Sequence, residues 1–225
     1  MRIKHVFFLI CIMQIWVSCK KEEGAGNEES TEQSSAALSA LEKEMLVLQD
    51  SIISYREKAF ALEEEKINST AALIDEVENV VSGYNAATLN AIQDALEKMQ
   101  SLRYDKKSLG NESVMLAYDA ACDELLSHLN TLARETEEFN KYVRANLLIS
   151  DIIEANNQDL FVRKDYNNYV KEYNEKLRDH NNELESIDNP QISEEKYPLF
   201  YGEPTSWNFT TFFFQLFKIE QWALA

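Results

Sequence analysis

The stretch D-Y-N-N-Y-V-K-E-Y-N, residues 165–174, places one Tyr-Asn pair seven residues before another. Seven residues are about two turns of an α-helix, so Tyr166 and Tyr173 fall on one face, with Asn167 and Asn174 on its flank. Tyrosine rings can pack inward and keep a hydroxyl for hydrogen bonding, and asparagine amides can bond to a neighbouring helix and fix its register. An aromatic stripe at helical spacing is usually core. We therefore interpret these residues as a helix–helix seam and interaction face, in preference to a ligand site.

Apolar residues recur at three-four spacing through most of the chain, which is typical of helices that bury one stripe against other helices. Neither Gly nor Pro occurs between Glu112 and Pro190. The sequence therefore predicts an all-α protein, an antiparallel bundle of three to four long helices with coiled-coil-like seams. The stripes are Leu38, Leu41, Met45, Leu48, Ile52, Tyr55, Ala59 and Leu62; Leu73, Val77, Val80, Val81, Tyr84, Leu89, Ile92, Leu96 and Met99; Tyr118, Cys122, Leu125, Leu129, Leu132, Thr136, Phe139 and Val143; and Val162, Tyr166, Val170, Tyr173 and Leu177.

Three positions are candidates for breaks between helices. Asn68-Ser69-Thr70 is a plausible cap or hinge, and the pattern leaves open whether residues 38–104 form one helix or two. Gly110 and Asn111 predict a loop. Asn156-Asn157 is the best candidate for a break before the helix that carries the double Tyr-Asn motif.

The N-terminus has the composition of a secretory signal. Arg2 and Lys4 precede an apolar run that is shorter than the about 20 residues of a membrane-spanning helix, and a serine stands directly before Cys19. Residues 1–18 resemble a bacterial lipoprotein signal peptide, which implies that Cys19 becomes the lipidated first residue of the mature chain. An uncleaved signal anchor and a secreted chain are the alternatives.

The residues after Cys19 bear on localisation. Lys21-Glu22-Glu23 resembles the surface-export tag of some Gram-negative lipoproteins, and a solvated charge run is the alternative. We expect a lipoprotein of the outer membrane, exposed on the cell surface if this tag operates. The expected organisation is a signal peptide over 1–18, a flexible acidic and Ser-rich tether over 19–37, a helical bundle over 38–188 and an aromatic-rich tail over 189–225.

The charge of the chain disfavours one class of partner. The net charge is −17, and removal of Arg2 and Lys4 with the signal peptide would make it −19. Such a field repels nucleic acid and anionic lipid headgroups. We therefore expect attachment to the membrane through the lipid on Cys19 and no nucleic-acid partner.

No pattern of catalytic or metal-ligating residues stands out. A di-iron bundle needs Glu-x-x-His, but Leu stands three positions before both His128 and His180. Glu124 and His128 are four residues apart and are interpreted as a surface contact, and Cys122 lies on an apolar stripe and is interpreted as an inert buried thiol. We expect no enzymatic activity, no cofactor and no metal.

The C-terminal tail is the most unusual segment. Residues 197–225 contain ten aromatic side chains. This tail can cover one end of the bundle, anchor in a membrane interface through Trp207 and Trp222, or bind a partner. We favour docking onto the bundle, because a free aromatic patch promotes aggregation.

Two stretches resemble the LemA family. V-R-K-D-Y-N-N-Y-V-K-E-Y-N-E-K-L, residues 162–177, is similar to that family's C-terminal helix, with an Arg, a Tyr-Asn pair, a Val and a second Tyr-Asn pair. Residues 72–92 resemble a second family segment, in which Leu73-Ile74 and Gly83-Tyr84 match and Asp75 replaces a proline. The resemblance implies a membrane-tethered antiparallel helical bundle without established enzymatic activity.

These observations lead to one expected function and two alternatives. We expect a lipid-anchored, non-catalytic structural or protein-interaction module of the cell envelope. A binding lipoprotein for an apolar ligand, with the aromatic tail as lid, and a carboxylate-rich metal-binding bundle are the alternatives. We expect a protein as the partner, with a second copy of the chain among the candidates.

Overall fold

The computed structural model describes residues 28–187 and 189–201. Cys19, the signal segment 1–18 and residues 202–225, with Trp207 and Trp222, lie outside the described residues. Within the described part the chain is helical and has no strands, which confirms the predicted all-α bundle. The elements are α1 (Glu28–Val80), α2 (Ala86–Ser101), α3 (Glu112–Glu135), the 3₁₀-helix η1 (Phe139–Lys141), α4 (Val143–Asp179) and α5 (Asn181–Glu185).

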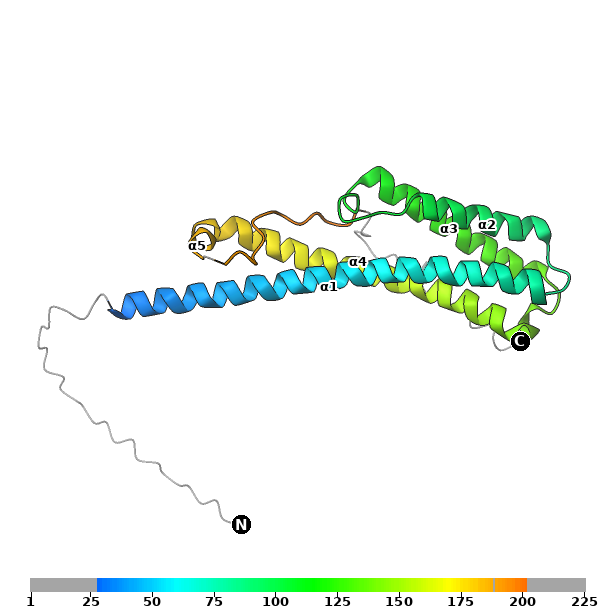
Figure 1. Ribbon diagram of the computed structural model, residues 1–225, viewed down its shortest axis with the longest axis horizontal. Coiled ribbons are helices and arrows are strands. Elements are labelled where there is room, and N and C mark those ends of the chain that lie inside the picture. Colours follow the sequence, from blue (N-terminus) through cyan, green and yellow to red (C-terminus); the bar gives the residue numbers. More distant parts are fainter. Residues whose placement is uncertain (1–27, 188, 202–225) are drawn as a thin grey trace, which may run out of the picture.

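Two long helices form the frame of an elongated molecule. α1 has 53 residues and α4 has 37, and the two lie antiparallel along each other. At 1.5 Å per residue they are about 80 Å and about 55 Å long. α2 and α3 form a shorter hairpin that covers the C-terminal half of α1 and the N-terminal half of α4 (Figure 1).

Helix α1 is longer and less interrupted than the sequence predicts. It begins at Glu28, inside the segment 19–37 that was expected to be a flexible tether, so that expectation is wrong from residue 28 onward. It also continues through Asn68-Ser69-Thr70. The hydroxyl of buried Thr70 donates to the carbonyl of Lys66 at 2.7 Å and is thereby satisfied within the helix.

The break between the first two helices lies at residues 81–85, so residues 38–104 contain two helices. Gly83 has a φ of +73°, a conformation in which an L side chain meets its own backbone. Asn85 then caps α2, because its side-chain oxygen accepts from the N–H of Ala87 at 2.9 Å. Asn111 caps α3 in the same way, as expected for the loop at Gly110 and Asn111.

The predicted break at Asn156-Asn157 is wrong, because α4 runs through both residues without interruption. The chain instead turns between α3 and α4, where Glu138 has a φ of 54° and η1 follows. The stripe predicted from Tyr118 to Val143 is therefore divided between elements. Its last member, Val143, begins α4 and is 67% exposed, and Val80 from the preceding stripe is 55% exposed.

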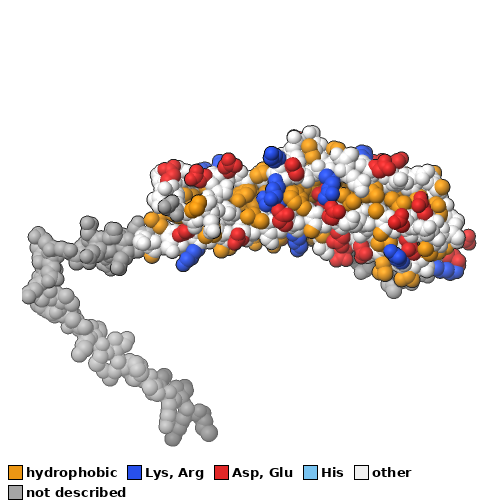
Figure 2. Space-filling model, viewed as in Figure 1, with side chains coloured by type: hydrophobic (Ala, Val, Ile, Leu, Met, Phe, Trp, Pro, Cys, Tyr) orange, Lys and Arg blue, Asp and Glu red, His pale blue; other side chains and the backbone are white. Residues whose placement is uncertain are grey.

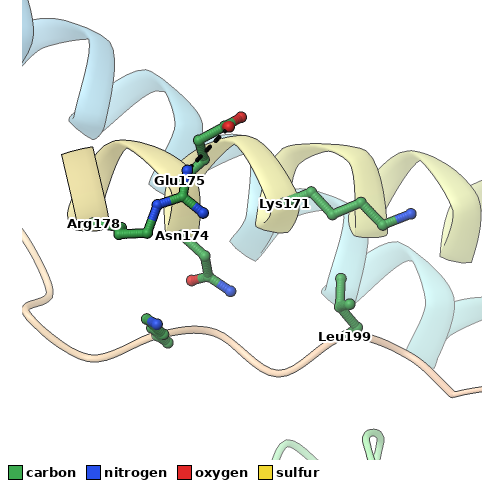
Figure 3. A pocket seen from close by; sticks show the side chains of 6 residues that line it. Lys171, Asn174, Glu175, Arg178 and Leu199 are labelled. Atoms are coloured by element: carbon green, nitrogen blue, oxygen red, sulfur yellow. Dashed lines mark hydrogen bonds and ion pairs between the residues drawn. The ribbon is translucent and has the colours of Figure 1, made fainter.

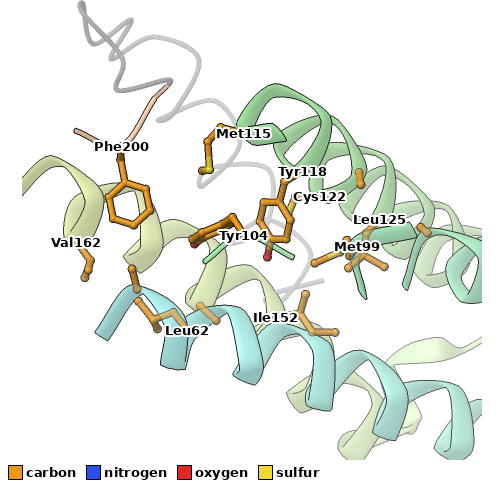
Figure 4. Packing of buried hydrophobic residues seen from close by; sticks show 14 of the residues in the cluster. Leu62, Met99, Tyr104, Met115, Tyr118, Cys122, Leu125, Ile152, Val162 and Phe200 are labelled. Carbon is orange, nitrogen blue, oxygen red and sulfur yellow. The ribbon is translucent and has the colours of Figure 1, made fainter. Parts of the chain in front are cut away.

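The remaining stripes meet in one continuous core. Tyr118, Tyr166 and Tyr173 are among its largest fully buried side chains. Tyr104, from the loop after α2, lies at its centre, with ring centroids 5.1 Å from Tyr118 and 5.7 Å from Phe200 (Figure 4). None of the helices in residues 28–187 or 189–201 contains an apolar stretch that could cross a membrane.

Candidate interaction site

The double Tyr-Asn motif binds an extended piece of main chain. After α5, the chain returns along α4 as residues 193–201, here called the clamped segment. The amide of Asn167 donates to the carbonyl of Phe200 at 3.1 Å and accepts from its N–H at 2.8 Å. Asn174 makes the same pair of bonds to Tyr197, at 2.8 and 3.0 Å. Each asparagine thus bonds to a main-chain N–H and C=O as a neighbouring β-strand would.

The spacing of the two asparagines matches the spacing of their partners. Seven helical residues span about 10.5 Å. The three-residue step from Tyr197 to Phe200 spans about 10 Å in extended chain. Both pairs of bonds can therefore form together, and a shift of the segment by one residue breaks both. The repeat fixes the register of the clamped segment.

The two tyrosines of the motif complete this face. Tyr166 donates from its hydroxyl to the carbonyl of Pro198 at 2.9 Å, and Tyr173 donates to that of Ser193 at 2.7 Å. Burial raises the pKa of each phenol to about 12, so both remain protonated donors at neutral pH. The four residues Tyr166, Asn167, Tyr173 and Asn174 are called the Tyr-Asn face below.

The partner of the Tyr-Asn face differs from the expected one. The tyrosine rings pack in the core, with both side chains fully buried. The asparagine amides, which were expected to bond to a neighbouring helix, bond to the main chain of the clamped segment. The first residues of the aromatic tail, 197–201, thus dock on the bundle, while residues 202–225 lie outside the described part.

Phe200 anchors the far end of the clamped segment. Its side chain is 2% exposed, and its ring centroid lies 4.9 Å from that of Tyr166 and 5.6 Å from the guanidinium carbon of Arg163. The segment also passes close to Gly110. A Cβ at Gly110 would lie 3.2 Å from the carbonyl oxygen of Leu199, so glycine permits this approach.

A group of charges, three of them buried, lies beneath Phe200. Lys66 Nζ is 3.0 Å from Asp159 Oδ2, and Arg163 bonds to both carboxylate oxygens of Asp159, at 2.8 and 3.1 Å. Arg163 also reaches Asp119 of α3 at 2.9 Å. Burial alone would lower the pKa of Arg163, but the two carboxylates raise it well above its ordinary value. Lys66, Asp119, Asp159 and Arg163 are called the charged array below.

The charged array also defines the surroundings of Cys122. Lys66 Nζ is 3.9 Å from Cys122 Sγ in the core. Burial raises the pKa of this thiol, and the ammonium of Lys66 opposes that shift only in part. Cys122 is therefore protonated at neutral pH and shielded from solvent. The contact with Lys66 was missed in the sequence, because the two residues lie on helices whose relative register the pattern does not define.

One carboxyl group next to the charged array is perturbed. Glu63 is 1% exposed, and burial raises its pKa from 4.5 to about 7, although the charges of Arg103 and Lys66 lower it. Arg103 Nε lies 3.4 Å from Glu63 Oε1, and the same guanidinium bonds more closely to Glu64, at 2.7 Å. Glu64 is exposed.

The surface beside the Tyr-Asn face has a shallow charged hollow. Its volume is about 400 Å³, and it is lined by Lys171, Asn174, Glu175, Arg178, Lys196 and Leu199 (Figure 3).

In residues 28–187 and 189–201, no three His, Cys, Asp or Glu side chains gather in a way that could hold a metal ion. Glu124, which was considered with His128, bonds to Lys98 of α2 at 2.7 Å.

Comparisons with protein-family models, with curated proteins and with solved structures gave no match.

We expect Asn167→Ala to release the clamped segment. The substitution leaves the N–H and C=O of Phe200 without their partner in a buried site, which costs about 1–3 kcal/mol of unfolding free energy. Hydrogen exchange of the Phe200 amide should accelerate, and limited proteolysis should cut within residues 193–201. The matched control is Asn168→Ala, because Asn168 is the exposed neighbour on the same helix. Equal protection of the Phe200 amide in both variants would contradict the assigned role.

We expect Glu63 to make folding stability depend on pH. Because its pKa is higher in the folded protein than its ordinary value of 4.5, the folded state holds the proton more tightly. This contribution is complete below about pH 4.5 and is lost as pH rises through about 7, a change of up to about 3 kcal/mol. Urea unfolding at pH 5 and pH 8 measures it. Glu63→Gln should flatten the decrease, whereas the exposed control Glu64→Gln should keep it; identical slopes in all three proteins would refute the assignment.

Proposed function

We propose that this protein is a lipid-anchored, non-catalytic protein-interaction module of the cell envelope, of LemA type. Cys19 carries the lipid, and the bundle is a rod that presents its surface to a protein partner. The proposal places the protein in the outer membrane, with exposure on the cell surface if Lys21-Glu22-Glu23 acts as an export tag.

The observation that carries this proposal is an exposed apolar tip at the end of the rod. Val80, Val143 and Leu147 are 55%, 67% and 58% exposed. They belong to the C-terminal end of α1 and the N-terminal end of α4. These ends are joined, because the hydroxyl of Tyr142 lies 2.8 Å from that of Ser82 and accepts from its N–H at 3.1 Å. Exposed apolar side chains gathered at one end are typical of a protein-binding surface.

The distance of the tip from the beginning of α1 supports the same function. α1 begins at Glu28, soon after Cys19 in the sequence, and reaches the tip at Val80 about 80 Å away. A lipid on Cys19 would therefore hold the opposite end of the rod near the membrane. Figure 2 shows acidic, basic and apolar side chains interspersed along one face of this rod.

We expect Cys19→Ala to release the protein from the membrane fraction of cells that express it, because the mature chain then lacks its lipid. In the same membranes, a photo-crosslinking amino acid at Leu147 should form discrete adducts with a partner protein. Val143→Asp should abolish these adducts without changing membrane attachment. A crosslinker at Val47, which is 64% exposed on α1 away from the tip, is the matched control.

Three experimental outcomes would contradict the lipid anchor, the surface exposure and the binding tip in turn. Retention of Cys19→Ala in the membrane would mean that residues 1–18 remain as a membrane anchor. Protease added to intact cells should digest a surface-exposed protein, and protection would contradict the export tag. Equal labelling from Leu147 and Val47, or adducts unaffected by Val143→Asp, would contradict the tip as the interaction surface.

A further inference from the structure

The chain leaves the clamped segment at the beginning of α3. The N–H of Tyr201 donates to the carbonyl of Leu109 at 3.1 Å, and its hydroxyl bonds to Glu112, the first residue of α3. Phe200 is buried just before it. The residues that follow Tyr201 therefore start at the side of the bundle where α3 and α4 face each other.

Among neighbouring pairs of helices α1 to α4, α3 and α4 are the least closely packed. α1 packs along α4, and α2 packs along α3, whereas α3 and α4 approach each other at few positions. The ion pair between Asp119 and Arg163 joins the two helices at 2.9 Å. The flank of the bundle between α3 and α4 is thus held by few contacts, and this ion pair is one of them.

Apolar side chains line both edges of this flank. Leu116 and Ala120, one turn apart on α3, are exposed, and Leu116 lies one turn before Asp119. On α4, Ile153 and Leu160 are two turns apart and only partly buried, and Leu160 lies one turn before Arg163. Leu116, Ala120, Ile153 and Leu160 are called the α3–α4 flank.

The sequence after Tyr201 has the chemistry and length to cover this flank. Residues 202–206, G-E-P-T-S, can reach up to about 17 Å as an extended linker. Residues 207–217, W-N-F-T-T-F-F-F-Q-L-F, are rich in aromatic side chains and carry no charge. They span about 16 Å as a helix or about 36 Å extended, and the 24 residues of α3 span about 36 Å.

We propose that the α3–α4 flank is the docking surface for residues 207–217 of the same chain. The linker brings the segment to the flank at high effective concentration, because it is tethered at Tyr201. Its uncharged side chains avoid repulsion by a protein with a net charge of −17. Docking removes the aromatic surface from water, which is the driving force.

Fluorescence of Trp207 tests this proposal in the full chain. Trp16→Phe and Trp222→Phe together leave Trp207 as the single tryptophan. We expect blue-shifted emission that acrylamide quenches weakly, at protein concentrations where size-exclusion chromatography shows a monomer. Leu116→Asp should shift the emission to the red and raise the quenching constant several-fold. The control Val47→Asp changes an exposed apolar residue on a different helix, α1, and should leave both readouts unchanged.

The helical signal in circular dichroism verifies that the variants remain folded. If Leu116→Asp unfolds the protein, Ala120→Arg is the alternative variant that places a charge on the flank. Solvent-like quenching of Trp207 in the parent protein would overturn the proposal. Protection that appears only as dimers form would assign the segment to a second copy of the chain. Protection that appears only on addition of phosphatidylcholine vesicles would assign it to a lipid surface.

Discussion

The carboxylate of Asp159 is the point on which the packing of the bundle depends. It accepts hydrogen bonds from Lys66 of α1 and from Arg163 of its own helix. Arg163 also forms an ion pair with Asp119 of α3. The side chains of Lys66, Asp159 and Arg163 are only 2–6% exposed. A buried charge that loses its partner costs about 3–5 kcal/mol, so the helices must align in the one register that keeps these groups together.

That register also determines what α4 presents to the clamped segment. Tyr166 and Asn167 follow Arg163 by one helical turn, so the Tyr-Asn face is aligned once Asp159 is paired. The guanidinium of Arg163 lies 5.2 Å from the ring centroid of Tyr104 and 5.6 Å from that of Phe200. Phe200 therefore covers the charged array, and the array provides a surface on which Phe200 packs. The packing of the core and the binding of the clamped segment along α4 therefore stabilise each other.

Apolar spacing was enough to predict the all-α bundle, most of its buried positions and the burial of Tyr166 and Tyr173. It could not predict the partner of Asn167 and Asn174, because spacing identifies the side of a helix that is covered and not the kind of segment that covers it. An extended segment donates and accepts hydrogen bonds through its main chain, whatever its side chains are. The side-chain pattern of residues 193–201 therefore does not show that this segment binds the two asparagines.

The positions of the turns were harder to predict for a related reason. Asn156-Asn157 has turn chemistry, but both residues lie on a partly buried flank of α4 and the helix continues. The turn after α3 contains neither Gly nor Pro and uses Glu138 in a left-handed conformation. The charged array was missed in the sequence: only Asp159 and Arg163, four residues apart, could have signalled it, because Lys66 and Asp119 join it through tertiary packing.

A double-mutant cycle between Lys66 and Asp159 tests most directly whether their ion pair sets the register of the bundle. Unfolding free energies from urea denaturation are compared for Lys66→Met, Asp159→Asn and the double variant. We predict that each single change destabilises the protein by about 3–5 kcal/mol, and that the double change costs about 2 kcal/mol less than their sum. Additivity within about 0.5 kcal/mol would show that the pair does not connect α1 to α4, and would contradict its role in setting the register of the bundle.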